Sequence, residues 1–184
     1  MKKTLFILLL FVNLSSFGQE TNVIWDKNEI SQYSKLVELA KYVSKKELSE
    51  ISKDTLYKKY IFFEHYMKDT VYERKNRRIM LFDTVFYHFK KIIDSIGVDN
   101  LDAKPVRFYK KHKIYEPFER ETAKQSISGE KMYTQDTNVF AYYKKDEPEN
   151  PLGVLLFEPL TNKLVSWILI DQGGYKYFLI FNMI

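Results

Sequence analysis

A basic cluster is the part of this sequence whose side chains are best suited to bind another molecule. Arg74, Lys75, Arg77 and Arg78 lie within five positions, at the start of a segment with helical periodicity. The helix dipole disfavours cations at that end by about 0.3 kcal/mol or more each, so local helix stability does not explain the cluster. The side chains can snorkel past the edge of a sheet, Arg78 can pair with a partly buried acid, or the cluster can bind an anion or an acidic partner. We therefore take Arg74, Arg77 and Arg78 as candidate binding residues.

Histidines and carboxylates form no catalytic pattern. His65 and Asp69 are four positions apart on a predicted helix, which lets them touch, but a catalytic zinc site needs about three protein ligands. His88 lies on the flank of another predicted helix. Glu158 and Asp171, at the ends of predicted strands, are the nearest candidates for a carboxylate pair. Because the chain also lacks a nucleophile elbow and a dinucleotide fingerprint, we expect no catalytic residue, no metal site and no cofactor.

The first eighteen residues have the three parts of a cleavable secretory signal. Lys2 and Lys3 precede the apolar run 5–12, and the small residues of 15–18 precede a cleavage point before Gln19. The apolar run is roughly half the length that crosses a bilayer, so we expect no transmembrane anchor after cleavage. The sequence thus predicts a signal peptide over 1–18, a single domain over 19–184, and a periplasmic or secreted protein.

Composition excludes several classes of function. The chain has no cysteine, which rules out disulfides, thiolate metal sites and a cysteine nucleophile. Two of its 29 basic residues lie in the signal, so the mature chain has 27 basic and 24 acidic residues and a net charge of +3. Nucleic-acid binding depends on many phosphate contacts, and so small a charge argues against it.

The first half of the mature chain has helical periodicity. Apolar residues recur at three- and four-residue steps over 30–43, 56–67 and 79–96, and Asn28 is a candidate cap for the first of these segments. The third segment is the clearest, because Gly97 follows it where a left-handed C-cap belongs. We expect about three helices.

The second half has the pattern of short antiparallel strands. Turn-rich gaps separate the last three segments, and such gaps allow hairpins but not parallel crossovers. The residues 117–129 have no clear pattern. The expected strands are 106–109, a hairpin of 131–134 with 139–144, and then 152–158, 164–170 and 175–182. The predicted fold is α+β, with N-terminal helices packed on a C-terminal antiparallel β-meander of about five strands.

The last three predicted strands are apolar on both faces, although an antiparallel sheet with one wet face should alternate. In 164–170, for example, Val165, Trp167 and Leu169 point one way while Leu164, Ile168 and Ile170 point the other. Helices can cover one face, and an open apolar face usually marks an interface. We therefore expect a non-enzymatic binding protein of the cell envelope, inhibitor- or immunity-like in type. It would contact a protein partner or a second copy through that face, with Trp167 a candidate contact. An envelope hydrolase with a dispersed carboxylate and histidine site, and a small-ligand carrier with a cavity in a curled sheet, are the alternatives.

Overall fold

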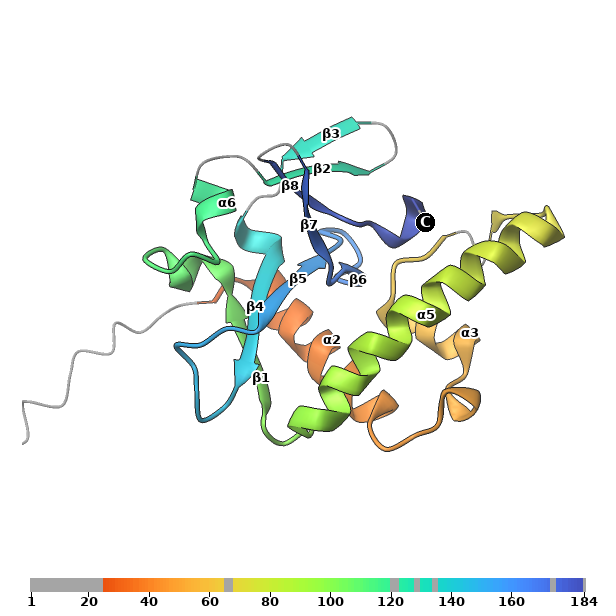
Figure 1. Cartoon of the computed structure of the whole chain (residues 1–184), viewed down its shortest axis with the longest axis horizontal. Helices are drawn as coiled ribbons and strands as arrows, with labels where there is room; N and C mark the ends of the chain where they lie inside the picture. The colour runs from red at the N-terminus through yellow and green to blue at the C-terminus, as the bar shows by residue number, and fades with distance from the viewer. Residues whose placement is uncertain are drawn as a thin grey trace, which may run out of the picture.

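The two long helices precede all the strands along the described chain, so the predicted α+β fold class is confirmed. A computed structural model describes residues 25–64, 68–119, 123–127, 130–133, 136–172 and 175–183 (Figure 1). The helical elements are α2 Lys27–Val43, η1 Leu48–Glu50, α3 Lys53–Thr55, η2 Leu56–Tyr60, α5 Tyr72–Ile96, η3 Val106–Tyr109, α6 Glu116–Glu119, η4 Asp136–Asn138 and η5 Phe181–Met183. The strands are β1 Leu101–Pro105, β2 Ala123–Ile127, β3 Glu130–Tyr133, β4 Val139–Lys144, β5 Gly153–Phe157, β6 Leu164–Ser166, β7 Leu169–Gln172 and β8 Tyr175–Phe178.

The two long helices begin and end where side chains satisfy their free backbone groups. Asp26, rather than Asn28, caps α2: its carboxylate accepts from the Glu29 N–H, and Glu29 accepts from the Asp26 N–H in return. Gly97 ends α5 with a φ of 82° and donates its N–H to the Ile93 carbonyl, as the sequence predicts. The predicted helix over 56–67 is interrupted, because the π-helical turn η2 ends at Tyr60 and residues 61–63 are not helical, while 65–67 lie outside the described residues.

The strands form two four-stranded sheets instead of one meander. The first sheet has the order β1-β4-β5-β6 and is antiparallel throughout. The second has the order β3-β2-β8-β7 and contains one parallel pair, between β2 and β8. The predicted hairpin of 131–134 with 139–144 is therefore wrong, since β3 and β4 belong to different sheets. Residues 106–109 form the 3₁₀-helix η3 instead of a strand.

Ser166 is the residue at which the predicted strand 164–170 divides between the two sheets. Its side chain is fully buried, and its hydroxyl donates to the Leu179 carbonyl at 2.8 Å and accepts from the Ile168 N–H at 3.1 Å. A serine hydroxyl that bonds nearby backbone groups competes with the regular strand ladder. The chain accordingly leaves the first sheet after Ser166 and enters the second as β7.

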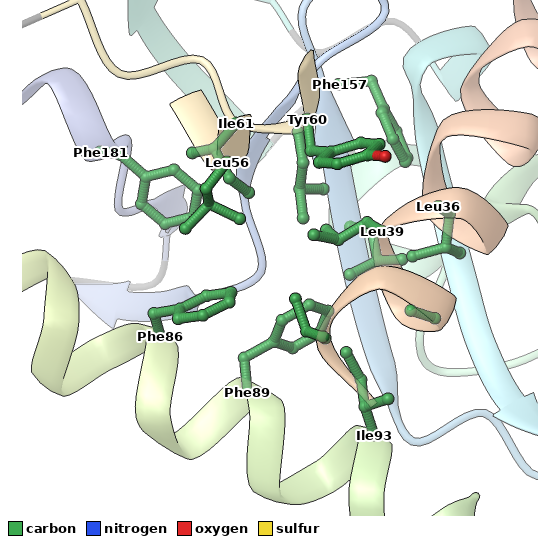
Figure 2. Close-up of a cluster of buried hydrophobic side chains, with 14 of the residues drawn as sticks. Leu36, Leu39, Leu56, Tyr60, Ile61, Phe86, Phe89, Ile93, Phe157 and Phe181 are labelled. Atoms are coloured by element: carbon green, nitrogen blue, oxygen red, sulfur yellow. The ribbon is translucent and has the colours of Figure 1, made fainter. Parts of the chain in front are cut away.

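The side of the first sheet that faces the helices is filled by the larger of two hydrophobic clusters. Leu36 and Leu39 of α2, and Phe86, Phe89 and Ile93 of α5, point into the same space (Figure 2). Along each strand, the residues that belong to this cluster alternate with residues that are polar or that face the other side of the sheet. They are Ala103, Phe140, Tyr142, Leu155, Phe157 and Leu164.

The opposite side of the first sheet is also covered, and the chain covers it with its own residues. Val139, Ala141 and Leu156 are fully buried there, against Val106 of η3 and Ile180, which follows β8. The two-faced apolarity of these strands is therefore real. The structure gives no support to the expectation that a partner or a second copy covers this face, because segments distant in sequence lie on it.

Candidate binding surface

Trp167 is partly buried and packs against the larger hydrophobic cluster. It lies on the bend between β6 and β7, and its ring stacks on Phe89 with centroids 4.4 Å apart and an interplanar angle of 10°. The ring of Phe181 lies 4.3 Å away on the same indole. Both of these neighbours are buried, so the contacts of Trp167 are with its own chain. The structure gives no support to Trp167 as a residue that binds a partner.

The N-terminal half of α5 has a different environment from the rest of the helix. None of the residues 72–81 is buried, whereas Phe82, Phe86, Phe89, Lys90 and Ile93 are buried in the part that follows. Figure 1 shows this end of α5 extending beyond the other elements. We call residues 72–81 the projecting half. At 1.5 Å per residue it measures about 15 Å.

Large apolar side chains are exposed on the projecting half. Tyr72 is 76% exposed and Met80 is 69% exposed, and Leu81 is 48% exposed. Val71, directly before the helix, is 50% exposed. The sequence reasoning overlooked these residues because it followed the buried stripe. The sequence does contain an indication of this exposure. Met80 and Leu81 lie outside the helical stripe that is formed by Phe82 and the core residues after it.

Arg74 is held within the chain at the foot of the projecting half. Its Nε and Nη2 atoms donate to the two carboxylate oxygens of Asp69, both at 2.8 Å. The Asp69 side chain is only 2% exposed, and it also accepts from the Val71 N–H at 3.0 Å. The hydrogen bond from the Arg74 guanidinium, helped by that N–H, holds the pKa of Asp69 well below its usual range. Arg74 therefore has a structural role at the start of α5.

The other basic residues surround the exposed apolar side chains. Arg77 is exposed and has no ion-pair partner in the described part of the chain, while Lys75 and Arg78 are half-buried on the side of the helix that continues the core stripe. The charge of Arg78 also helps to lower the pKa of Asp69, so Arg78 interacts with that carboxylate. Snorkelling of Lys75 and Arg78 past the packed region stays a prediction. Arg77 has no such structural explanation.

The other residues that the sequence offered for chemistry are not brought together. His65 lies outside the described residues, and His88 is exposed on α5 against Tyr87. Glu158 accepts the N–H groups of Leu160 and Thr161, so its carboxylate stabilises the turn after β5.

Asp171, on β7 in the second sheet, pairs with Lys176 instead of with Glu158. Among the described residues no group of three or more histidine, aspartate or glutamate side chains is placed to hold a metal ion.

Comparisons with known proteins identify no relative. The chain matches no protein-family model, no curated protein and no solved structure. In the part of the chain that the structure describes, no helix combines the length and the apolar composition needed to span a membrane. The function must therefore be argued from the surface itself.

Proposed function

We propose that this chain is an exported, non-enzymatic binding protein of the cell envelope, and that the projecting half of α5 contacts an acidic protein partner. The observation that carries the proposal is the combination of shape and chemistry at residues 72–81. This half of the helix buries none of its residues in its own chain, yet it exposes Tyr72, Met80 and Leu81 beside Arg77. Tyrosine, methionine and arginine are enriched at protein interfaces.

The projecting half is held ready for contact by the rest of the helix. An isolated helix of ten residues is marginal in water, because nucleation is costly. Here the helix is continuous with the packed residues 82–96, and the Asp69–Arg74 pair anchors its start. A partner therefore meets a surface that is already ordered and loses less conformational entropy on binding.

The charge of the projecting half favours an acidic partner. Residues 72–81 contain the basic residues Arg74, Lys75, Arg77 and Arg78 and one acid, Glu73, and the exposed Arg77 has no ion-pair partner in the described part of the chain. The positive end of the helix dipole lies at the same place. An acidic protein surface interacts favourably with both, and complementary charge of this kind raises the rate of association. Nucleic acid is a poorer candidate because the mature net charge of +3 is small.

Export is the second part of the proposal, and it rests on the sequence of the leader. Lys2 and Lys3, the apolar run 5–12 and the small residues before Gln19 support it. Mass spectrometry of the protein recovered outside the cytoplasm of its source cells tests it. The expected mass is that of a chain beginning at Gln19, and recovery of the full-length chain in the cytoplasm contradicts export.

The two alternative functions have less support. A hydrolase would need its carboxylates together, and Glu158 and Asp171 each have separate structural partners. A small-ligand carrier would need a cavity inside a curled sheet, and hydrophobic clusters fill both sides of β4 and β5. Neither alternative has an observation that favours it.

The test of the docking surface compares two matched double variants of the mature chain. Arg77→Glu with Met80→Ser changes the projecting half, and Lys41→Glu with Ile30→Ser makes the same kinds of change on the exposed face of α2. Proteins retained by the immobilised wild type are identified, purified and titrated against all three forms by calorimetry. We expect an acidic protein that binds the wild type and the α2 variant equally, and the α5 variant at least tenfold more weakly.

Salt and solution mass complete this test. The affinity for the partner should fall as the NaCl concentration rises, because the contact is partly ionic. A partner that binds the α5 variant as tightly as the wild type, or the absence of any retained acidic protein, overturns the proposed docking surface. A doubled mass in light scattering that only the α5 variant loses also overturns it, since the occupant is then a second copy.

A further inference from the structure

A basic pocket lies at the opposite side of the molecule from the free end of α5. It has a volume of about 600 Å³ and is lined by η3 and the turn that follows it, together with the loop after β4. Figure 1 shows the elements that flank this segment, β1 and α6, far from the N-terminal end of α5. The lining residues are Arg107, Phe108, Tyr109, Lys110, Lys111, His112 and Glu149.

Buried contacts fix the inner wall of this pocket. Arg107 donates from Nε and Nη2 to the two carboxylate oxygens of Glu29, both at 2.7 Å, and Glu29 is fully buried at the start of α2. Tyr109 is 3% exposed, and its hydroxyl donates to the Pro148 carbonyl. That bond ties the loop containing Glu149 to η3. The wall is therefore positioned by the fold before any ligand binds.

Arg107 and Glu149 of the pocket each already have a partner of opposite charge. Glu29 matches Arg107. Glu149 has its carboxylate 3.6 Å from Nζ of Lys104, whose ammonium also lies 4.4 Å from the centre of the Tyr109 ring. Among the described lining residues, the one carboxylate, that of Glu149, thus has a cation of its own beside it.

The remaining polar groups of the pocket are hydrogen-bond donors. Lys110 and Lys111 are exposed, and neither has an ion-pair partner among the residues that the structure describes. His112 accepts the Ile114 N–H at Nδ1, at 3.1 Å, so the proton of the neutral ring is on Nε2. Two ammonium groups and an imidazole N–H suit a ligand that is doubly charged and only accepts hydrogen bonds.

We infer that this pocket binds a small organic phosphate, with the phosphoryl oxygens on Lys110, Lys111 and His112. A phosphate monoester supplies a charge near −2 and three acceptor oxygens. The volume exceeds what a phosphate ion occupies and falls in the range of small-molecule sites. The ring of Phe108, which has the Arg107 guanidinium 4.2 Å from its centre, provides a wall for the organic part. This site is separate from the docking surface on α5.

The test uses phenyl phosphate, inorganic phosphate and benzyl alcohol as probes in nuclear magnetic resonance titrations of the mature chain. We expect saturable binding of phenyl phosphate in the millimolar range or tighter, with the largest amide shifts at residues 107–112. Inorganic phosphate should bind the same amides more weakly, and benzyl alcohol should not bind. The inference is overturned if phenyl phosphate does not saturate the protein up to 50 mM, which is on the order of tenfold above a millimolar-range Kd.

Matched lysine variants make the test specific. Lys110→Gln with Lys111→Gln should weaken binding of phenyl phosphate at least tenfold. Lys58→Gln with Lys59→Gln, an exposed adjacent pair on η2, should leave the binding unchanged. Equal weakening by the two double variants, or amide shifts spread over all surface lysines, overturns the inference, because binding then reflects overall charge. The α5 variant keeps phosphate binding, so the two proposals can fail separately.

Discussion

Residues 82–96 and the projecting half, residues 72–81, belong to one continuous helix but differ in what they contact. The first part contributes Phe82, Phe86, Phe89 and Ile93 to the larger hydrophobic cluster, while the projecting half buries none of its residues (Figures 1 and 2). Both parts carry large apolar side chains, so composition alone does not separate them. The difference between them is burial. Residues 82–96 contribute to the stability of the fold, whereas the projecting half is available for contact with another molecule.

The strongest test of this difference is the truncation of one apolar residue in each half. Phe89 is 3% exposed and stacks on Trp167, so Phe89→Ala should cost about 3–5 kcal/mol of unfolding free energy. Met80 is 69% exposed, and Met80→Ala should change stability by less than about 0.5 kcal/mol. Urea unfolding measures both. A loss of similar size for Met80→Ala would show that the projecting half is part of the core.

The second prediction concerns the bend that brings Trp167 under the packed half of α5. Ser166→Ala removes a fully buried hydroxyl and leaves the Leu179 carbonyl and the Ile168 N–H without that partner. The expected cost is about 1–3 kcal/mol, the price of leaving buried polar groups unsatisfied. Ser95→Ala, at an exposed hydroxyl on α5, is the control and should be close to neutral. Equal stability of the two variants would show that Ser166 does not hold the bend.

Ser166 also shows where sequence reasoning reaches its limit. The stripe that contains Phe82, Phe86 and Phe89 predicts the packed part of α5, and Gly97 predicts its end, because both signals are local. The division of 164–170 depends on a hydroxyl that bonds Leu179, thirteen positions away. No local pattern indicates that bond.

The sequence also predicted only part of the candidate binding surface. The sequence singled out Arg74, Arg77 and Arg78 as candidate binding residues, and the structure shows Arg74 paired with Asp69 at the start of α5. It could not show that Asp69 binds Arg74, since the expected partner of Asp69 was His65. It also inferred correctly that these strands are apolar on both faces, but it expected one face to be left open for a partner. The covering residues, such as Val106 and Ile180, come from distant segments, so periodicity could not identify them.

A third prediction tests the anchor at the foot of the projecting half by pH. The pKa of Asp69 is lowered in the folded chain, so its ion pair with Arg74 stabilises the start of α5 above the ordinary aspartate pKa of about 3.9. This stabilisation is lost as the pH falls below that value through the folded pKa. The carboxyl carbon shift of Asp69 should therefore titrate below 3.9 in the wild type. In Arg74→Gln it should move back toward 3.9, and an unchanged titration would contradict the assigned cause.

The smallest expected effect is that of Arg77→Glu on stability. This variant distinguishes a role of Arg77 in folding from a role in binding most directly. Arg77 is exposed and has no ion pair within the described residues, so its reversal removes no contact that the fold needs. An acid is slightly favoured near a helix N-terminus, which limits the change to about 0.5 kcal/mol in either direction. Urea unfolding should therefore not distinguish Arg77→Glu from the wild type, while the affinity for an acidic partner falls. A clear loss of stability would mean that Arg77 serves the fold, and the difference between the two halves of α5 would then no longer support a docking surface.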